Sequence, residues 1–174
     1  MASAVADWPG VSLLEVGYEV TLSGVVAGTA EHDAALAAAT EVKGHESIDD
    51  QLEVQTDLDE ARLNELVGLE PVVFDSNNAT IETESFAVLD AAVEVLAATT
   101  GDVVIEGHTD TRGAAETNRA LSEARAIAVV DYLISKGVAA DRLTAIGYGE
   151  ERPLVEPDDN SEAQQANQRI EFKL

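Results

Sequence analysis

The sequence predicts an α+β protein with two domains, the second of which has helices packed on a mixed sheet. Three observations support this prediction. Apolar residues alternate with polar ones between Tyr18 and Ser23, which is the period of a half-buried strand. Gly68 and Pro71 provide stop signals that divide the chain. Beyond them, apolar segments of strand and helix character alternate, an order that builds a sheet covered by helices. The 174 residues suffice for two small domains.

The segment before this divide predicts three strands and one helix. Thr29 is the expected cap of an Ala-rich helix, and Gly44 is its expected end. In chain order, the expected elements are a strand at 13–16, a strand at 18–23, a helix at 30–42 and a strand at 48–54. We therefore expect a small first domain over residues 1–56.

A linker helix is expected next, over residues 57–70, and a larger domain over residues 71–174. Three- and four-residue spacing of apolar side chains indicates the helices, and short apolar runs indicate the strands. The expected elements of this domain are a strand at 72–74, a helix at 82–98, a strand at 103–105, a helix at 117–136, and strands at 143–146 and 169–174.

Composition excludes several classes of function. The formal net charge of -24 repels phosphate backbones, so nucleic acid is not an expected partner. The absence of cysteine excludes disulfides and thiolate metal sites. Since no run reaches the about 18 apolar residues of a membrane span, we expect no direct membrane insertion by this chain. We expect the full-length protein to have a signal or membrane tether outside this sequence.

The most informative side chain is Arg125, because it falls within the apolar stripe of the helix expected at 117–136. A buried guanidinium needs an acceptor, since removing it from water without one is costly. Asp110, in the loop that precedes this helix, is the nearest candidate, and Asn118 shares the helical face of Arg125. Two interpretations are open: a buried Asp110–Arg125 pair that only fixes the loop, or a pocket for a ligand that has an ammonium and a carboxylate close together.

The segment from Val72 to Leu174 resembles the OmpA-like C-terminal domain, which binds peptidoglycan. The residues that carry this resemblance form an ordered signature: Phe74 to Asn77, Gly107 to Asp110, Gly113, Asn118, Leu121, Ser122, Arg125, Ala126, Leu133, Gly137, Val138, Gly147 to Glu150, Pro153, Asn167 and Arg169 to Glu171. The resemblance implies a β-α-β-α-β-β domain that binds the diaminopimelate of the peptidoglycan stem peptide without cleaving it.

The resemblance also implies roles for single residues. Asp110 and Arg125 would hold the amino-acid head group of diaminopimelate, Asn118 and Asn77 would add hydrogen bonds, and Arg169 would contribute from the last strand. Two positions depart from the family pattern: Gln168 stands where a second arginine is frequent, and Arg112 lies in a loop position that is commonly small or polar.

Residues 17–54 resemble a BON domain, a small envelope module, although the first helix of its usual pattern is missing. The combination resembles actinobacterial envelope proteins of the OmpA family. It implies a location in the cell envelope, on the periplasmic or cell-wall side, and an envelope partner for the first domain.

The alternative to a binding protein is a metal-assisted hydrolase that uses Asp110 and His108, which would share one face of a strand-like backbone. A zinc site needs three or four ligands, and His32 and His45 lie in the first segment. Ser122 has no nearby candidate for a general base. We therefore expect no catalysis, no cofactor and no metal, and we expect His108 to form hydrogen bonds within its loop.

Overall fold

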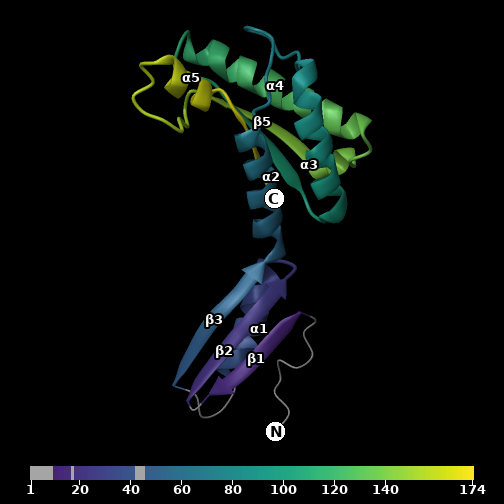
Figure 1. The fold of residues 1–174 in the computed structure, drawn as a ribbon, viewed down its shortest axis with the longest axis vertical. Coiled ribbons are helices and arrows are strands. Elements are labelled where there is room, and N and C mark those ends of the chain that lie inside the picture. The colour runs from purple at the N-terminus through teal and green to yellow at the C-terminus, as the bar shows by residue number, and fades with distance from the viewer. Residues whose placement is uncertain (1–9, 17, 42–45) are drawn as a thin grey trace. The chain divides into compact units, whose positions relative to one another are not determined.

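The computed structural model describes residues 10–16, 18–41 and 46–174 (Figure 1). The chain forms two compact units, Met1–Asp59 and Glu60–Leu174, and each is described by itself. Among the described residues, no helix combines the length and the apolar character needed to cross a membrane.

The first unit is a three-stranded sheet with one helix. Its elements are β1 (Val11–Val16), β2 (Glu19–Val26), α1 (Thr29–Thr40) and β3 (Ser47–Val54). β2 lies in the centre, antiparallel to β1 and parallel to β3. Val20 and Leu22 are buried on one face of β2, in keeping with the alternating pattern of the sequence.

The start of α1 differs from our prediction. Thr29 is the first residue of the helix, and Gly28 holds the N-cap position in an extended conformation without a side-chain hydrogen bond. Thr29 therefore cannot cap the helix. The end predicted at Gly44 lies outside the described residues.

The second unit has helices packed on a mixed sheet, which confirms the predicted fold class. Its sheet has the order β5-β4-β6, with β4 parallel to β5 and antiparallel to β6. Its helices and strands are α2 (Gln55–Leu69, which begins in the first unit), α3 (Phe86–Ala98), β4 (Val103–His108), α4 (Ala115–Ser135), β5 (Leu143–Gly149), α5 (Ser161–Asn167) and β6 (Ile170–Lys173), with 3-10 turns at Thr83–Ser85 and Ala140–Arg142.

The strand predicted at residues 72–74 is wrong. Only Phe74 makes a β-bridge, to Ile81, and this bridge lies outside the sheet. The backbone N–H of Val73 donates instead to Ser85 Oγ at 2.7 Å, and its carbonyl accepts from the N–H of Glu82. Because these backbone groups bond to the turn before α3, they are not available for a sheet ladder. α5, which the sequence did not predict, follows the loop at residues 150–160.

Two glycines let α4 lie directly on the sheet. A Cβ atom on Gly107 would come within 2.2 Å of the Ser122 carbonyl oxygen, and one on Gly147 within 2.3 Å of the Glu123 nitrogen. Any side chain at these positions would push the helix away. The close approach holds the first half of α4, with Asn118 and Arg125, beside the end of β4.

The helix α2 is part of the second unit's structure beyond Glu60. Leu63 and Val67 are buried in the same core as the sheet residues Ile105 and Phe172. Asn64 binds the edge of β6: its Nδ2 donates to the Phe172 carbonyl, and its Oδ1 accepts from the Phe172 N–H, both at 2.8 Å. The segment that we expected to be a linker helix thus supplies core residues and covers a strand edge.

Candidate binding site

A cleft of about 550 Å³ lies where β4 ends and α4 begins. It is lined by Phe74, Ser76, Asn77, Thr109, Asp110, Arg112, Gly113, Asn118, Leu121, Arg125 and Gln168. Four of the five residues implied by the resemblance, Asp110, Arg125, Asn118 and Asn77, are therefore brought together, although they come from three separate segments.

Asp110 is a buried carboxylate at the base of the loop that follows β4. Its Oδ1 accepts from the Arg112 N–H at 3.0 Å. Its Oδ2 accepts from Arg112 Nε at 3.1 Å, from Arg112 Nη2 at 2.6 Å and from Gln168 Nε2. Burial by itself raises the pKa of Asp110, but the hydrogen bonds from Arg112 and Gln168 outweigh it and hold the pKa below its usual value. Asp110 is therefore ionised at neutral pH.

Arg125 is also buried, but its guanidinium has a different environment. Its Nε donates to the Asn78 carbonyl at 3.0 Å, and its Cζ lies 4.9 Å from the centre of the Phe74 ring. Among the described residues, no carboxylate lies within 4.0 Å of it. Burial lowers the pKa of Arg125, while the charge of Asp110 raises it.

The buried Asp110–Arg125 ion pair considered from the sequence is thus not formed. Asp110 forms its ion pair with Arg112, at 2.6 Å, because the short loop directs the Arg112 side chain back to the carboxylate two residues earlier. Arg125 contributes positive charge to the cleft and keeps hydrogen-bond donors that the described part of the chain does not use.

The two asparagines differ in what they offer to a ligand. Asn118 is buried, and its Nδ2 contacts the carbonyls of Asp110 (3.3 Å) and Arg112 (3.1 Å) and Glu150 Oε2 (2.6 Å). The amide N–H groups of Asn118 therefore hold the loop, and its Oδ1 is the atom left to accept from a ligand. Asn77 is exposed at the cleft, with a left-handed backbone (φ 56°) that asparagine tolerates.

Arg169 does not line the cleft, which corrects its expected place. Its guanidinium donates to Glu171 Oε1 at 2.6 Å and to the Arg152 carbonyl at 3.2 Å. Gln168 instead donates to Asp110, so the two neighbouring side chains face different sites. Gln168 and Arg112 are the side chains bonded to Asp110 that our sequence analysis did not assign to the site. Their departure from the family pattern was the available signal.

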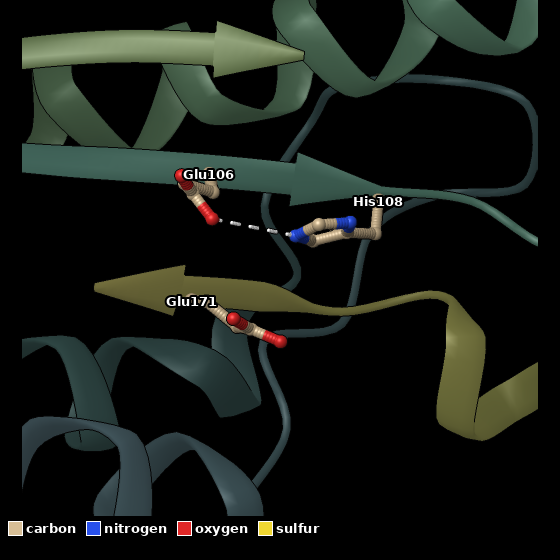
Figure 2. A group of neighbouring side chains, drawn as sticks. All are labelled: Glu106, His108 and Glu171. Atoms are coloured by element: carbon tan, nitrogen blue, oxygen red, sulfur yellow. Dashed lines mark ion pairs between the residues drawn. The ribbon is translucent and has the colours of Figure 1, made fainter. Parts of the chain in front are cut away.

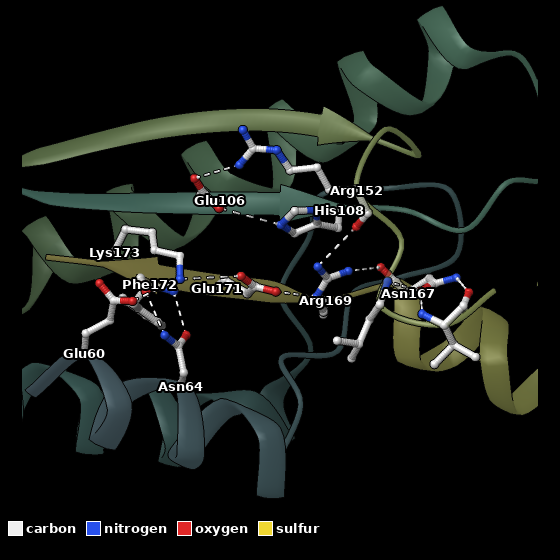
Figure 3. A network of polar contacts seen from close by, with 12 residues as sticks. Glu60, Asn64, Glu106, His108, Arg152, Asn167, Arg169, Glu171, Phe172 and Lys173 are labelled. Carbon is white, nitrogen blue, oxygen red and sulfur yellow. Dashed lines mark hydrogen bonds and ion pairs between the residues drawn. The ribbon is translucent and has the colours of Figure 1, made fainter. Parts of the chain in front are cut away.

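The other side of β4 and β6 carries a second charged cluster, which we call the strand network: Glu106, His108, Arg152, Arg169, Glu171 and Lys173 (Figure 3). Glu106 and Glu171 are opposite each other in the β4–β6 register. Arg152 lies 3.6 Å from Glu106, and Arg169 lies 2.6 Å from Glu171. Each carboxylate of this pair thus has a cationic partner, which offsets the repulsion between them.

His108 lies within this network and does not line the cleft. Its side chain is buried, and its Nε2 lies 4.0 Å from Glu106 Oε2 (Figure 2). Within the described part of the chain, neither ring nitrogen has a hydrogen-bond partner, so the predicted loop hydrogen bond is wrong. The strand ends at His108, after which the chain turns and Asp110 no longer shares its face. Burial, and then the charge of Arg169, lower the pKa of His108 to about 4.

Glu106, His108 and Glu171 are the described residues whose ligand atoms, all within 4.8 Å of one another, could in principle hold a metal ion. Asp110 is not among them, so the metal centre of His108 and Asp110 that a hydrolase would need is not formed. Arg152, Arg169 and Lys173 already lie within 4.0 Å of the two carboxylates. A divalent cation would have to displace these side chains, so the cluster is best understood as an ion-pair network.

Comparison with known proteins agrees with the fold and with the position of the cleft. The model of the OmpA family matches residues 73–168, which is more than half of the chain. The chain therefore belongs to the OmpA family. The match covers the cleft and, of the strand network, Glu106, His108 and Arg152. It does not cover the first unit.

Individual relatives cover the same region. Outer membrane protein A of Escherichia fergusonii is 45% identical over 87 residues, which are 48% of this chain and 36% of the relative. The peptidoglycan-associated lipoprotein of Pseudomonas putida is 39% identical over 100 residues, 58% of this chain and 60% of the relative. The chain thus spans between about a third and three fifths of these two curated relatives. The crystal structure of the peptidoglycan-associated lipoprotein from Burkholderia pseudomallei is similar, with a TM-score of 0.54, 28% identity, and coverage of 59% of this chain and 86% of that one.

Proposed function

We propose that the second unit binds peptidoglycan noncovalently, through the diaminopimelate of its stem peptide, and so anchors an envelope protein to the cell wall. The observation that carries this proposal is the presence of two buried, opposite charges in one cleft, of which Arg125 has no carboxylate partner among the described residues. The proposal is supported by relatives that are named for their association with peptidoglycan. It places the protein in the cell envelope, as the names of these relatives indicate.

The chemistry of the cleft fits an amino-acid head group. A guanidinium presents a planar fork of donors that matches a carboxylate, and a carboxylate accepts hydrogen bonds from an ammonium. We assign the ligand's carboxylate to Arg125 and its ammonium to Asp110. We assign further hydrogen bonds with the ligand to Asn118 Oδ1 and Asn77, which line the same cleft.

A binding role requires two charges and no reaction, whereas hydrolysis requires a nucleophile or an activated water. Asp110 and His108, the pair considered for hydrolysis, lie in different environments, and only Asp110 lines the cleft. We therefore propose that the protein does not cleave its ligand and needs no cofactor.

The test is sedimentation with insoluble cell-wall sacculi that contain diaminopimelate. The intact protein is expected to sediment with them, and Arg125→Ala and Asp110→Ala are expected to remain in solution. Arg169→Ala, which removes a nearby arginine outside the cleft, is the matched control and should sediment. Circular dichroism shows whether each variant is folded. Sedimentation of folded Arg125→Ala at the level of the intact protein would contradict the proposal, and release of soluble fragments lost in Asp110→Asn would favour a hydrolase.

For the first unit we propose a separate interaction role with an envelope partner. It lies outside the region matched by the family model. The resemblance to a BON domain and to the actinobacterial arrangement remains a prediction, supported by the order of two strands, a helix and a third strand.

A further inference from the structure

Arg112 already covers the carboxylate that the proposed function assigns to the ligand's ammonium. Its Nε and Nη2 both donate to Asp110 Oδ2, at 3.1 and 2.6 Å. The two partners differ greatly in exposure, because the side chain of Arg112 is 64% exposed and that of Asp110 only 7%. The buried acid is therefore held by a side chain that can leave it for water. A ligand ammonium that approaches Asp110 must first compete with this guanidinium.

Asp158 offers a second acceptor beside the same loop. Its Oδ2 accepts from the N–H of Thr111, the residue next to Arg112, at 2.8 Å. Its Oδ1 is buried and, among the described residues, has no hydrogen-bond partner. The charge of Asp158 also helps to raise the pKa of Arg112, after the larger effect of Asp110, so the two side chains are close enough to interact. An unsatisfied buried carboxylate oxygen is costly, and a guanidinium that moved to it would remove that cost.

We propose that Arg112 is a latch on the ammonium subsite, which covers Asp110 and transfers to Asp158 when a ligand ammonium takes its place. This inference rests on the proposed function of the cleft. Any ligand that brings an ammonium must therefore displace a two-pronged hydrogen bond at Asp110. A ligand with an ammonium alone gains nothing at Arg125, whereas a ligand with an adjacent carboxylate also binds Arg125.

Gln168 makes this exchange feasible without loosening Asp110. Its amide donates to the same Oδ2, and the Arg112 N–H donates to Oδ1. Both bonds can persist when the Arg112 side chain departs, because neither involves the guanidinium. The carboxylate therefore keeps its orientation and its charge while one donor replaces another.

The experiment is calorimetric titration with two synthetic stem peptides, one with diaminopimelate and one with lysine at the same position. Four proteins are compared: the intact chain, Arg112→Ala, Asp158→Asn and the double variant. Arg112→Ala is expected to bind both peptides about threefold to tenfold more tightly, by the same factor for each, since the guanidinium no longer competes for Asp110. Asp158→Asn should weaken binding of the diaminopimelate peptide by a similar factor, because Asn keeps the bond to Thr111 but accepts a guanidinium poorly.

The double variant separates a latch from two independent effects. With Arg112 absent, Asp158→Asn should change nothing, so the double variant should bind as Arg112→Ala does. Equal effects of Asp158→Asn with and without Arg112 would overturn the latch, as would unchanged affinity of Arg112→Ala for both peptides. Absence of binding by every variant would instead overturn the proposed function, and the latch with it.

A second measurement does not depend on any ligand. The pKa of Asp110, followed by nuclear magnetic resonance, should rise in Arg112→Ala if the guanidinium holds this carboxylate in solution, while Arg119→Ala, which removes a nearby exposed arginine, should leave it unchanged. An Asp110 pKa that is the same in the intact protein and in Arg112→Ala would show that the covering contact is not made, and would overturn the latch whatever the peptides do.

Discussion

The cleft and the strand network both combine a buried carboxylate with arginines, yet their charges are arranged differently. In the network, Glu106 and Glu171 each lie within 4.0 Å of a cationic side chain. In the cleft, Arg125 is buried without a carboxylate partner in the described part of the chain, and Asp110 is held by a largely exposed arginine. Charged side chains that are paired within the protein contribute to the fold. A charged side chain without an ion-pair partner, or with a partner that can move away, is available to bind a ligand. This difference in charge pairing leads us to expect that the ligand binds in the cleft and not at the strand network.

The largest expected effect is a difference in affinity between two stem peptides, which tests whether Arg125 binds a carboxylate of the ligand. Diaminopimelate ends in a carbon with both an ammonium and a carboxylate, whereas lysine ends in an ammonium alone. With the lysine peptide, the Arg125 guanidinium has no carboxylate to bind in the cleft, which reduces the binding free energy by on the order of 1 to 3 kcal/mol. We expect the diaminopimelate stem peptide to bind about tenfold to hundredfold more tightly in calorimetry, each factor of ten being about 1.4 kcal/mol.

Two variants connect this preference with the comparison between the regions. Arg125→Ala should reduce the preference sharply, and Arg169→Ala, in the strand network, should preserve it. Equal affinities of the intact protein for the two peptides would mean that Arg125 serves the fold, as the arginines of the network do.

A second prediction concerns pH and the network alone. The pKa of His108 is about 4 in the folded protein, against 6.5 as its ordinary value, so the fold favours the neutral imidazole. Between these values the unfolded chain binds more protons. The contribution of neutral His108 to the free energy of unfolding is therefore fully present above about pH 6.5 and is lost as the pH falls towards 4. When the pH is lowered from 7.5 to 5, the effect of His108 should reduce the free energy of unfolding by about 2 kcal/mol.

Urea unfolding of the intact protein and of His108→Gln at both pH values measures this contribution. Glutamine does not titrate, so the variant should lose about 2 kcal/mol less between pH 7.5 and 5. The difference between the two proteins cancels the effect of the other acidic groups. An identical pH dependence would show that the imidazole is not buried as a neutral ring.

The sequence was sufficient to predict the fold class because periodicity reports local burial. The alternating pattern at β2 and the apolar stripes of α3 and α4 depend on which face of each element is buried. The predicted strand at 72–74 failed because an apolar run does not reveal where its backbone hydrogen bonds go. The structure directs those of Val73 to Ser85 and Glu82.

The site could be predicted where a charged residue lies among apolar positions, as Arg125 does within the apolar stripe of its helix. The residues that surround Arg125 and Asp110 could not be predicted from this pattern. The pairing of Asp110 with Arg112 depends on the path of a short loop, and the different contacts of Gln168 and Arg169 depend on the path of the chain before β6. A charged side chain at an apolar position of a helix can be recognised in the sequence, but tertiary structure determines which of two possible partners it contacts.

A smaller effect is expected at the edge of β6, beside the strand network. Asn64→Ala removes two hydrogen bonds to the Phe172 backbone. At about 0.5 to 1.5 kcal/mol for each bond, urea unfolding of the second unit should show a loss of about 1 to 3 kcal/mol. Glu65→Ala, at an exposed position of the same helix, is the control and should change little. Equal stability of both variants would mean that α2 does not cover this edge in solution.

The smallest effect is expected for an ion pair that belongs to neither region. Arg119 Nη1 lies 2.9 Å from Glu151 Oε1, within hydrogen-bond distance, but the two side chains are 59% and 58% exposed. Water screens such a pair, so Arg119→Ala should change the unfolding free energy by less than about 1 kcal/mol and leave peptide affinity unchanged. Raising the salt concentration should reduce even this difference, whereas the selectivity due to Arg125 should persist because Arg125 itself is buried. If Arg119→Ala weakened binding as strongly as Arg125→Ala, charge near the cleft, and not the particular placement of Arg125, would be the source of affinity.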